Sequence, residues 1–401
     1  MYTLQAMQYI PRIAEELIRE LLKTLKIVIV LGARQVGKTT LIERLLRKQA
    51  GLIINLDIAV DKARLLAASN LPPTEAIKSL GNPTILVIDE AQRLPEVATI
   101  VKGWYDAHVQ SKIVLLGSSS LNLLDQAAET LTGRNEKVYL PPLLFTEILK
   151  NQTWYSNSFT MATLKKSFAS QIQSLLISQI IYGSYPETVV TNDKVRYLLN
   201  LTSDYLLKDV LQSGLVKSEE IVKKLLLLLA YQIGSAVSVN ELASNLNIAR
   251  QTVERYLELL EKTFVIFRLH AFSTNQRKEI VKSTKVFFWD TGVRNALLKD
   301  FSHSEYRSDI GALFENWVIA EVAKKNILEG QRYNIFFWRT SDGSEVDLVI
   351  KGADIFKAYE IKWTKMGTFG RSFTNRYNIP IATITKETML DSLPIFSPTS
   401  T

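Results

Sequence analysis

Cysteine is absent from this chain of 401 residues, and histidine occurs only as His108, His270 and His303. Without cysteine the chain can form no disulfide, no thiolate zinc site and no cysteine nucleophile. Three scattered histidines do not favour a histidine-based metal cage. Any metal ion is therefore expected to have oxygen ligands, which points to Mg²⁺ or Mn²⁺.

Long hydrophobic runs are missing as well. A helix needs ~20 apolar residues to span a membrane, whereas the longest apolar run here covers residues 225–230. Residues 1–9 are mixed in character and several acidic residues follow them closely, which is not the pattern of a signal peptide. We therefore expect a cytoplasmic protein with no membrane contact.

The composition is that of a globular chain, with 47% hydrophobic and 22% charged residues. Its length favours two or three domains. The net charge of +8 permits contact with nucleic acid. It does not establish such contact, because many basic proteins never bind DNA.

Residues 32–39 fit the phosphate-loop pattern GxxxxGK[ST] at every fixed position. An apolar segment, 27–31, precedes the loop, and a segment with helical spacing, 40–47, follows it. Backbone N–H groups of such a loop and the positive end of its helix bind phosphates. Lys38 is expected to reach the β- and γ-phosphates, and Thr39 to ligate Mg²⁺. The predicted ATP-binding residues are Gly32, Ala33, Arg34, Gln35, Val36, Gly37, Lys38, Thr39 and Thr40.

A second motif is the apolar segment 84–88, which ends in Asp89 and Glu90. A continuous apolar run is typical of a central parallel strand with helices on both faces. Asp89 is expected to bind ATP-bound Mg²⁺, and Glu90 to orient and deprotonate the attacking water. The alternative is a strand end followed by two solvated acids.

Further strand-like segments at 52–56, 113–116 and 138–140 alternate with helical stretches. This alternation predicts an α/β domain with a parallel sheet and right-handed crossovers. A strand between the loop and the Asp-Glu strand indicates the branch of ATPases that carries a catalytic glutamate. Ser118 or Ser119 is placed to sense the γ-phosphate, and a plain serine-rich turn is the alternative.

These motifs occur in the same order in prokaryotic AAA-type P-loop ATPases with a conserved C-terminal region, the group labelled DUF 4143, which the chain resembles along nearly its whole length. The segments that carry the resemblance are 32–40, 88–92, 117–120, 131–134, 182–187 and 289–292. The resemblance implies that Arg134 completes an ATP site, in its own subunit or a neighbouring one of a homo-oligomer, and neutralises charge on the phosphoryl group. The alternative is an arginine in a surface loop.

After a helical connector at 151–216, residues 217–292 have the element order of a winged helix. That order is two helices joined by a tight turn and then a two-stranded wing. The expected elements are a helix at 239–246 with Asn240 as its N-cap, a helix at 250–263, and strands at 265–269 and 285–289.

In a DNA-binding winged helix the second helix enters the major groove and the wing contacts phosphates. The predicted contacts are Arg250, Gln251, Thr252 and Arg255 on the helix, and Arg277, Lys278, Lys282 and Lys285 on the wing loop. DNA is therefore the expected partner. The alternative is a module that only packs against protein, because a fold alone does not decide function.

Residues 345–363 are predicted to form a β-hairpin. With its turn after residue 353, Asp347 lies opposite Glu360, and Glu345 lies opposite Lys362, all on one face. Carboxylates that face each other repel, so this pair is either poorly placed or holds a cation. The alternative is a surface hairpin with a Glu345–Lys362 ion pair.

An aspartate followed across a turn by Glu-x-Lys is the layout of the PD-(D/E)xK nucleases, which a helical glutamate upstream completes. In this interpretation Glu315, Asp347 and Glu360 hold Mg²⁺ or Mn²⁺, and Lys362 orients or activates the attacking water. The Pro-Asp of the motif name is absent, because Val346 precedes Asp347. Whether the domain still cuts is therefore left open.

Together these patterns predict an α/β chain in which a P-loop AAA-type ATPase domain is followed by a winged-helix domain and a restriction-endonuclease-like domain. The leading hypothesis is a Mg²⁺-dependent ATPase that acts on DNA. One alternative is a nucleotide-switched regulator that binds DNA or protein through an inactive nuclease-like domain, and another is a signalling ATPase that needs no DNA. The predicted parts are an ATPase domain (1–150), a connector (151–216), a winged helix (217–292), a nuclease-like domain (293–385) and a tail (386–401).

Overall fold

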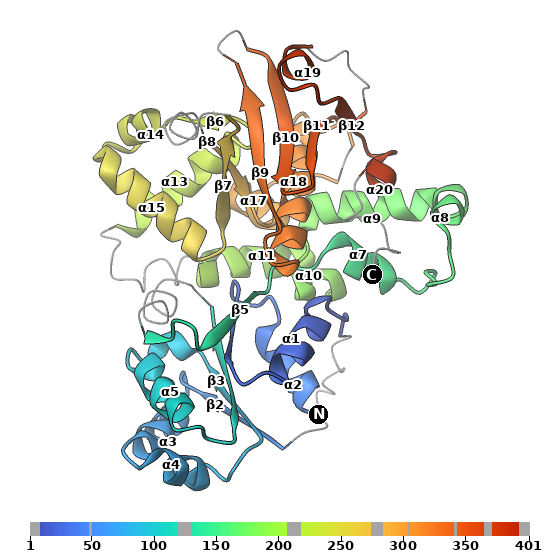
Figure 1. Ribbon diagram of the computed structural model, residues 1–401. Helices are drawn as coiled ribbons and strands as arrows, with labels where there is room; N and C mark the ends of the chain where they lie inside the picture. Colours follow the sequence, from blue (N-terminus) through green and yellow to red (C-terminus); the bar gives the residue numbers. More distant parts are fainter. Residues whose placement is uncertain are drawn as a thin grey trace. The chain divides into compact units, whose positions relative to one another are not determined.

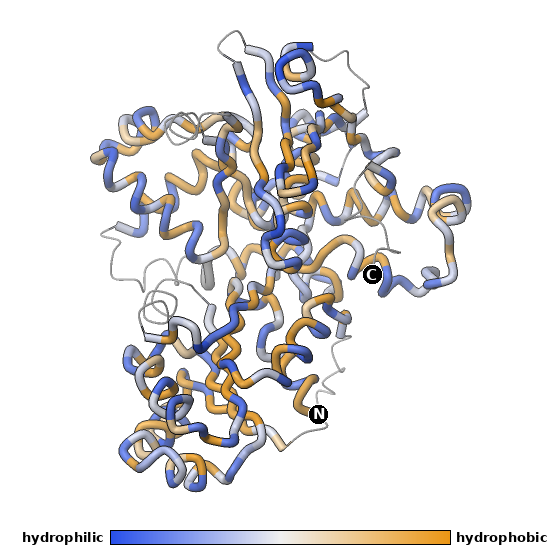
Figure 2. Tube along the Cα trace, viewed as in Figure 1, coloured by the Kyte–Doolittle hydropathy of each residue, from blue (hydrophilic) through white to orange (hydrophobic). Residues whose placement is uncertain are grey.

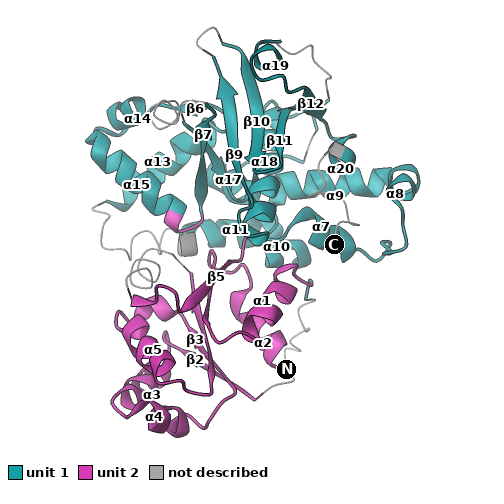
Figure 3. Cartoon of the chain, viewed as in Figure 1, with its two compact units in different colours: residues 1–10, 142–261, 265–401 teal, residues 11–141, 262–264 magenta. Residues whose placement is uncertain are grey.

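The computed structural model describes residues 9–47, 50–118, 130–206, 218–273, 284–303, 305–340, 343–364 and 371–392. The chain divides into two compact units, which Figure 3 shows in two colours. The N-terminal unit comprises residues 11–141 and 262–264, and the C-terminal unit comprises residues 1–10, 142–261 and 265–401. No helix within the described ranges is long and apolar enough to cross a membrane.

A five-stranded sheet forms the centre of the N-terminal unit (Figure 1). Its order is β2-β3-β4-β1-β5, and every neighbouring pair is parallel. The predicted α/β fold with a parallel sheet is therefore confirmed for this unit. The strands are β1 (Ile27–Leu31), β2 (Gly51–Asn55), β3 (Ile85–Asp89), β4 (Lys112–Gly117) and β5 (Asn135–Tyr139).

Strands β1 and β3 are buried along their whole length, as expected of central strands covered on both faces. Figure 2 shows the strands of this sheet as largely hydrophobic, and β3 is apolar up to its last residue, Asp89. Both lie next to β4, so the loop after β1 and the acids that end β3 meet at the carboxyl edge of the sheet. The helices of this unit are α1 (Ala14–Leu22), α2 (Lys38–Leu46), α3 (Ala59–Ser69), α4 (Pro73–Ser79), α5 (Val97–Asp106) and the 3₁₀ helix η1 (Ala91–Arg93).

The chain after residue 142 is rich in helices, as predicted for the connector. Glycine and proline separate two of them, because Gly183 ends α9 and Pro186 begins α10. The helices are α7 (Phe145–Lys150), α8 (Met161–Ser167), α9 (Ala169–Tyr182), α10 (Pro186–Val190), α11 (Lys194–Asn200), the π-helix η2 (Leu201–Leu206), α13 (Glu219–Tyr231), α14 (Val239–Leu246), α15 (Arg250–Lys262), α17 (Thr291–Leu298), α18 (Ile310–Leu328), α19 (Ser372–Tyr377) and α20 (Met389–Ser392).

A seven-stranded mixed sheet lies in the C-terminal unit, with the order β12-β11-β10-β9-β7-β8-β6. Strand β7 pairs antiparallel with β8 and parallel with β9. The strands predicted for the wing and for the hairpin therefore belong to one continuous sheet. The strands are β6 (Ala236–Val237), β7 (Ile266–Ala271), β8 (Thr284–Phe288), β9 (Tyr333–Arg339), β10 (Glu345–Gly352), β11 (Phe356–Ile361) and β12 (Ile381–Ile384).

The helix pair predicted at 239–263 is present, with one correction at its start. The cap of α14 is Ser238, whose hydroxyl accepts a hydrogen bond from the backbone N–H of Glu241. Asn240, the predicted cap, already lies inside the helix, because a cap needs extended backbone and Ser238 has it. The apolar stripe of α15, which includes Val253 and Leu257, is buried as expected.

Two segments that carry the family resemblance, 182–187 and 289–292, contact each other in the C-terminal unit. The carboxylate of Asp290 accepts hydrogen bonds from the backbone N–H of Ser184 at 2.6 Å and from its hydroxyl at 3.2 Å. A Cβ on Gly183 would lie 1.9 Å from Asp290, and φ is +71° there, so only glycine fits. The buried ammonium of Lys324 also donates to the hydroxyl of Ser184, at 2.9 Å.

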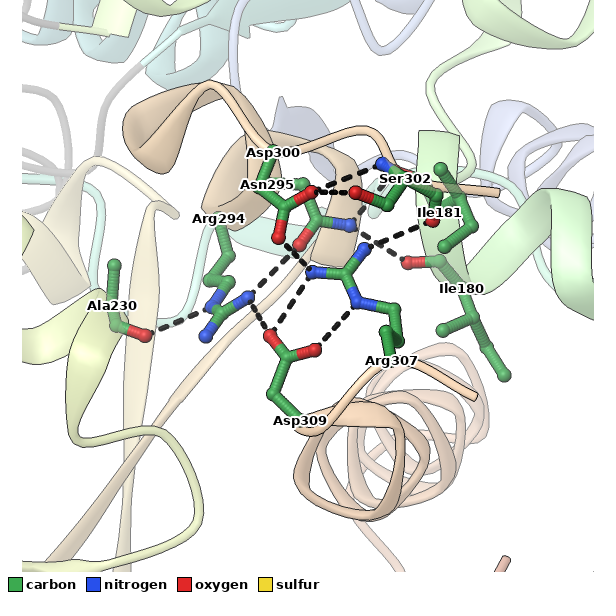
Figure 4. A network of polar contacts seen from close by, with 9 residues as sticks. All are labelled: Ile180, Ile181, Ala230, Arg294, Asn295, Asp300, Ser302, Arg307 and Asp309. Atoms are coloured by element: carbon green, nitrogen blue, oxygen red, sulfur yellow. Dashed lines mark hydrogen bonds and ion pairs between the residues drawn. The ribbon is translucent and has the colours of Figure 1, made fainter. Parts of the chain in front are cut away.

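A second polar network fixes the start of α18, the helix that carries Glu315 (Figure 4). Asp309, just before α18, accepts hydrogen bonds from Arg294 at 2.6 Å and from Arg307 at 2.5 and 3.0 Å. Arg294 also donates to the carbonyl oxygen of Ala230 at the end of α13. The buried charge of Arg294 is therefore paired, as burial requires, and its contacts join α13 and α17 to the start of α18.

Candidate functional site

The phosphate loop connects β1 to α2 with backbone that requires glycine at two positions. Gly37 has a φ of +90°, a left-handed conformation that costs glycine little. A Cβ on Gly32 would lie 2.2 Å from the carbonyl oxygen of Leu140, which is far closer than any contact allows. The loop is therefore held against the chain that leaves β5.

Lys38 lies over this loop as the motif predicts. Its side chain is buried, and its ammonium donates hydrogen bonds to the carbonyl oxygens of Gly32 at 2.9 Å and Ala33 at 3.0 Å. The positive charge is therefore held next to the start of α2, and N–H groups at the start of a helix are suited to bind phosphate.

The two predicted Mg²⁺ ligands meet across the sheet edge. The hydroxyl of Thr39 donates a hydrogen bond to Oδ2 of Asp89 over 2.8 Å, and Asp89 is buried. The other carboxylate oxygen, Oδ1, accepts from the backbone N–H of Glu90 at 2.8 Å. A hydroxyl and a carboxylate side by side are oxygen donors of the kind that Mg²⁺ prefers, so these residues fit the ion.

Glu90 lies at the end of β3 with a left-handed backbone, φ +52°. Gln92 joins it to Ser118, because its amide nitrogen donates to Glu90 Oε2 at 2.5 Å and to Ser118 Oγ at 2.9 Å. Burial raises the pKa of Glu90, and the charge of Lys38 opposes this increase. A carboxylate with a raised pKa is a stronger proton acceptor.

Gln92 was not among the residues predicted for the site, although it belongs to the Ile-Asp-Glu-Ala-Gln segment of the resemblance. The amide oxygen of Gln92 is buried without a hydrogen-bond partner in the described part of the chain. Of the two serines predicted as sensors, Ser118 is buried beside Gln92, and Ser119 lies outside the described residues.

Arg12 is a second residue that sequence reasoning missed. Its buried guanidinium donates to the carbonyl oxygen of Val36 in the phosphate loop at 2.9 Å and to that of Pro141 at 2.6 Å. No motif surrounds Arg12 in the sequence, so only the fold reveals this contact.

Arg134 lies at the edge of the sheet opposite the phosphate loop. Its carbonyl oxygen accepts from the backbone N–H of Ile27, the first residue of β1, whereas the loop follows the last. Five residues of strand separate these ends by roughly 16 Å. The guanidinium is paired with Asp106 at 2.7 Å. Arg134 therefore does not reach the ATP site of its own chain, and its predicted role now requires a neighbouring subunit.

In the C-terminal unit, β10 and β11 pair in the predicted register, with Leu348 opposite Tyr359. Lys362 bridges the two acids of the hairpin, lying 3.2 Å from Asp347 and 2.9 Å from Glu360. The ion pair of the alternative interpretation, Glu345–Lys362, is not the one found: Glu345 pairs with Lys285 at 2.5 Å and with Arg339 at 3.6 Å.

Glu315 lies on α18, a helix as predicted, and its Oε1 is 3.0 Å from the ammonium of Lys285. Burial, together with the charge of Asp347, raises the pKa of Glu315 to about 7. Burial and Asp347 also raise the pKa of Glu360 to about 7. The four residues predicted for a nuclease site are therefore electrostatically coupled.

Lys285 corrects a prediction about the wing. It was expected to contact DNA phosphates from the wing loop, but it lies in β8 with its side chain only 2% exposed. Its charge is directed to Glu315 and Glu345 because a buried ammonium needs carboxylate partners. The other predicted wing contacts, Arg277, Lys278 and Lys282, lie outside the described residues.

The predicted Mg²⁺ or Mn²⁺ site in this region does not fit the arrangement found. Within the described ranges, no group of three or more histidine, aspartate or glutamate side chains is arranged to hold a metal ion. Lysine ammonium groups already neutralise the carboxylates: Lys285 contacts Glu315 and Glu345, and Lys362 contacts Asp347 and Glu360.

The residues predicted to read DNA bases lie at the start of α15. Arg250 and Gln251 are exposed there, and Thr252 is half-buried. Arg255 is half-buried, and its guanidinium lies 5.7 Å from the ring centre of Tyr256. Two of the four predicted contacts are thus fully available at the surface.

Comparison with known families assigns the phosphate-loop region. Residues 24–149 match the model of an AAA domain. This region resembles an AAA-type ATPase domain. Residues 173–304 and 310–384 match two families described as domains of unknown function, DUF8612 and DUF4143. The match at the C-terminus agrees with the DUF 4143 resemblance noted in the sequence.

Similar proteins are found in bacteria and archaea. An uncharacterised protein of Mycobacterium tuberculosis is 27% identical over 362 residues, covering 88% of this chain and 74% of that protein. An uncharacterised protein of Methanocaldococcus jannaschii is 26% identical over 359 residues, covering 84% and 76%.

Among solved structures, a Walker-type ATPase of Pyrococcus abyssi matches 72% of this chain and 96% of its own, with a TM-score of 0.51 and 17% identity. At this identity the match shows a common fold. Together with the AAA match, it supports ATPase activity in general.

Proposed function

We propose that this chain is a Mg²⁺-dependent ATPase that hydrolyses ATP at the carboxyl edge of β1, β3 and β4. The observation that carries the proposal is the 2.8 Å hydrogen bond between Thr39 and Asp89, with Glu90 immediately beyond it. These oxygens suit Mg²⁺, which neutralises charge on the transferring phosphoryl group when it is bound.

In this proposal each residue has a distinct task. Lys38 exchanges its carbonyl partners, Gly32 and Ala33, for phosphate oxygens of ATP. Glu90 accepts a proton from the attacking water, and Gln92 orients that water with its buried amide oxygen while its nitrogen holds Glu90.

The proposal is tested by substituting Glu90→Gln in the full chain. Nucleotide binding should persist, because Lys38 and Thr39 are unchanged, and the hydrolysis rate should fall by about 10²-fold or more. Glu96→Gln, at an exposed glutamate of the same unit, is the matched control and should hydrolyse ATP normally. Equal rates in Glu90→Gln and the parent chain would remove Glu90 from the mechanism.

DNA is the proposed partner of the C-terminal unit. Support comes from the order of its elements, in which α13, β6, α14, α15, β7 and β8 follow one another and β7-β8-β6 form one edge of the sheet. This order supports the winged-helix interpretation, and Arg250 and Gln251 are exposed at the start of the second helix of the pair.

The alternative for residues 293–385, a nuclease-like domain that binds without cutting, is favoured by one observation. The acids of the nuclease-like layout, Glu315, Asp347 and Glu360, each lie beside a lysine ammonium. We therefore propose a nucleotide-switched DNA-binding protein. ATPase rates measured with duplex, forked and single-stranded DNA would separate it from a signalling ATPase, whose rate no DNA should change.

A homo-oligomer with shared ATP sites is proposed from the position of Arg134. The arginine lies at the edge of the sheet opposite the phosphate loop, and so it can complete only the site of another subunit. This part of the proposal is independent of DNA.

A further inference from the structure

The carboxylates of the C-terminal unit include a pair drawn from distant parts of the sequence. Glu315 comes from the helix α18, and Glu345 is the first residue of β10. Both contact the ammonium of Lys285, at 3.0 Å and 2.5 Å, although Lys285 comes from β8, which is not adjacent to β10 in the sheet.

We propose that Lys285 is the resident cation of this carboxylate pair, so that an ammonium group of the chain itself neutralises Glu315, one of the three carboxylates with which a nuclease of this layout would hold a divalent metal ion. The inference rests on the contacts of the C-terminal unit alone and is independent of ATP hydrolysis and DNA binding.

The surroundings of Lys285 hold it in place. Its side chain is 2% exposed, and its ammonium lies 5.5 Å from the ring centre of Phe337 on β9. Aromatic faces attract cations, more strongly away from water. On the far side of Glu315, a Cβ on Gly234 would lie 3.2 Å from its Oε2. The backbone therefore closes over one oxygen of this glutamate while Lys285 contacts the other.

The second lysine of the cluster has a different environment. Lys362, which contacts Asp347 and Glu360, has a side chain that is 44% exposed. A half-exposed ammonium is open to solvent, where it can contact a water molecule. A buried ammonium with two carboxylate partners cannot move away without leaving two negative charges that repel each other. Lys285 is therefore the residue that keeps a divalent ion away from Glu315.

The test is thermal unfolding of the full chain without nucleotide, with and without Mn²⁺, followed by tryptophan fluorescence. All tryptophans except Trp104 belong to the C-terminal unit, so the signal reports on that unit. The Asp89→Asn background removes the predicted Mg²⁺ ligand of the N-terminal unit and is used throughout.

In this background Mn²⁺ should leave the unfolding midpoint unchanged. Lys285→Met should unfold at a lower temperature without metal, because Glu315 loses the cation it contacts and Glu345 keeps only Arg339 among the described residues. Mn²⁺ at roughly a hundredfold excess over its Kd should then raise the midpoint by several degrees. The double variant Lys285→Met/Glu315→Gln removes one charge of each sign, so it should recover much of the stability and respond less to Mn²⁺.

Two results would overturn the proposal. In the first, Mn²⁺ stabilises the chain with Lys285 intact as much as it stabilises Lys285→Met. The ion would then bind beside the lysine. The second is a double variant that is no more stable than Lys285→Met, which would mean that Lys285 acts through packing and not through charge. In a chain that retains Asp89, Lys285→Met should leave ATP hydrolysis unaffected. Failure of the proposal for Lys285 is therefore distinguishable from failure of the ATPase proposal.

Discussion

Thr39 and Asp89, fifty positions apart in the sequence, are joined by a 2.8 Å hydrogen bond from hydroxyl to carboxylate. The two oxygens belong to the two motifs from which ATP and Mg²⁺ binding were predicted independently. Their contact arises because β1 and β3 both flank β4, so the start of α2 lies close to the end of β3.

Gln92 should position the attacking water together with Glu90. We expect Gln92→Ala to lower kcat by roughly ten- to a hundredfold with little change in KM, because the side chain contacts Glu90 and Ser118 and not the phosphate loop. Steady-state ATPase kinetics measure both constants. Gln152→Ala, which removes an amide bonded to a helix carbonyl elsewhere, is the control. A rise in KM at constant kcat would assign Gln92 to nucleotide binding instead.

Arg134 should act only on a neighbouring subunit. Arg134→Ala and Lys38→Ala chains are each expected to be inactive, and a mixture of the two should recover part of the ATPase rate, because intact sites form at mixed interfaces. Asp106→Asn keeps the arginine but weakens its ion pair, and so it should remain active. Normal hydrolysis by Arg134→Ala alone would end the arginine-finger interpretation.

Exposed polar residues at the start of α15 should contribute to DNA affinity. Each phosphate contact removed lowers the slope of log affinity against log salt by about 0.9. We expect Arg250→Ala/Arg255→Ala to weaken duplex binding and to reduce that slope by up to twice this amount, as measured by fluorescence anisotropy in a salt series. Lys223→Ala/Lys224→Ala removes the same charge from α13, where both lysines pair with glutamates. Equal losses in both variants would indicate a non-specific charge effect.

The C-terminal unit should lose stability as the pH rises through neutrality. Burial raises the pKa of Glu315 and Glu360 to about 7, above the value of about 4.3 for an unfolded glutamate. Between these values the folded chain binds more protons than the unfolded chain, so the free energy of unfolding falls with increasing pH. The effect is about 1.4 kcal/mol per pKa unit.

Tryptophan-detected denaturation at pH 5, 6, 7 and 8 measures this dependence. Glu360→Gln should flatten it, because the amide does not titrate, whereas the exposed Glu258→Gln should leave it unchanged. A stability that rises between pH 5 and 7 would contradict the raised pKa of both carboxyl groups.

The nucleotide site was predictable because its demands are local in the sequence. A loop that wraps phosphate needs glycine at fixed spacing and a following helix, and residues 32–39 show both. The hairpin register was predictable for a similar reason, since side chains alternate with a period of two. Arg12 was not predictable, because the carbonyl oxygens that it binds have no sequence signature.

The pairing of Lys285 with Glu315 and Glu345 was also beyond sequence reasoning. The three residues lie on β8, α18 and β10, and nothing in their spacing indicates that they meet. The same applies to β7, whose parallel pairing with β9 merges strands predicted for separate domains into one sheet. In this continuous sheet Lys285 is buried. It therefore lacks the role in DNA contact that was expected from its position beside the wing.

Arg12 makes hydrogen bonds to two separate parts of the chain. Val36 belongs to the loop that is predicted to bind phosphate, whereas Pro141 is the last residue of the N-terminal unit before the chain continues at residue 142. One rigid, planar guanidinium spans both carbonyl oxygens. The predicted phosphate loop and the backbone that leaves the N-terminal unit are therefore anchored by one and the same side chain.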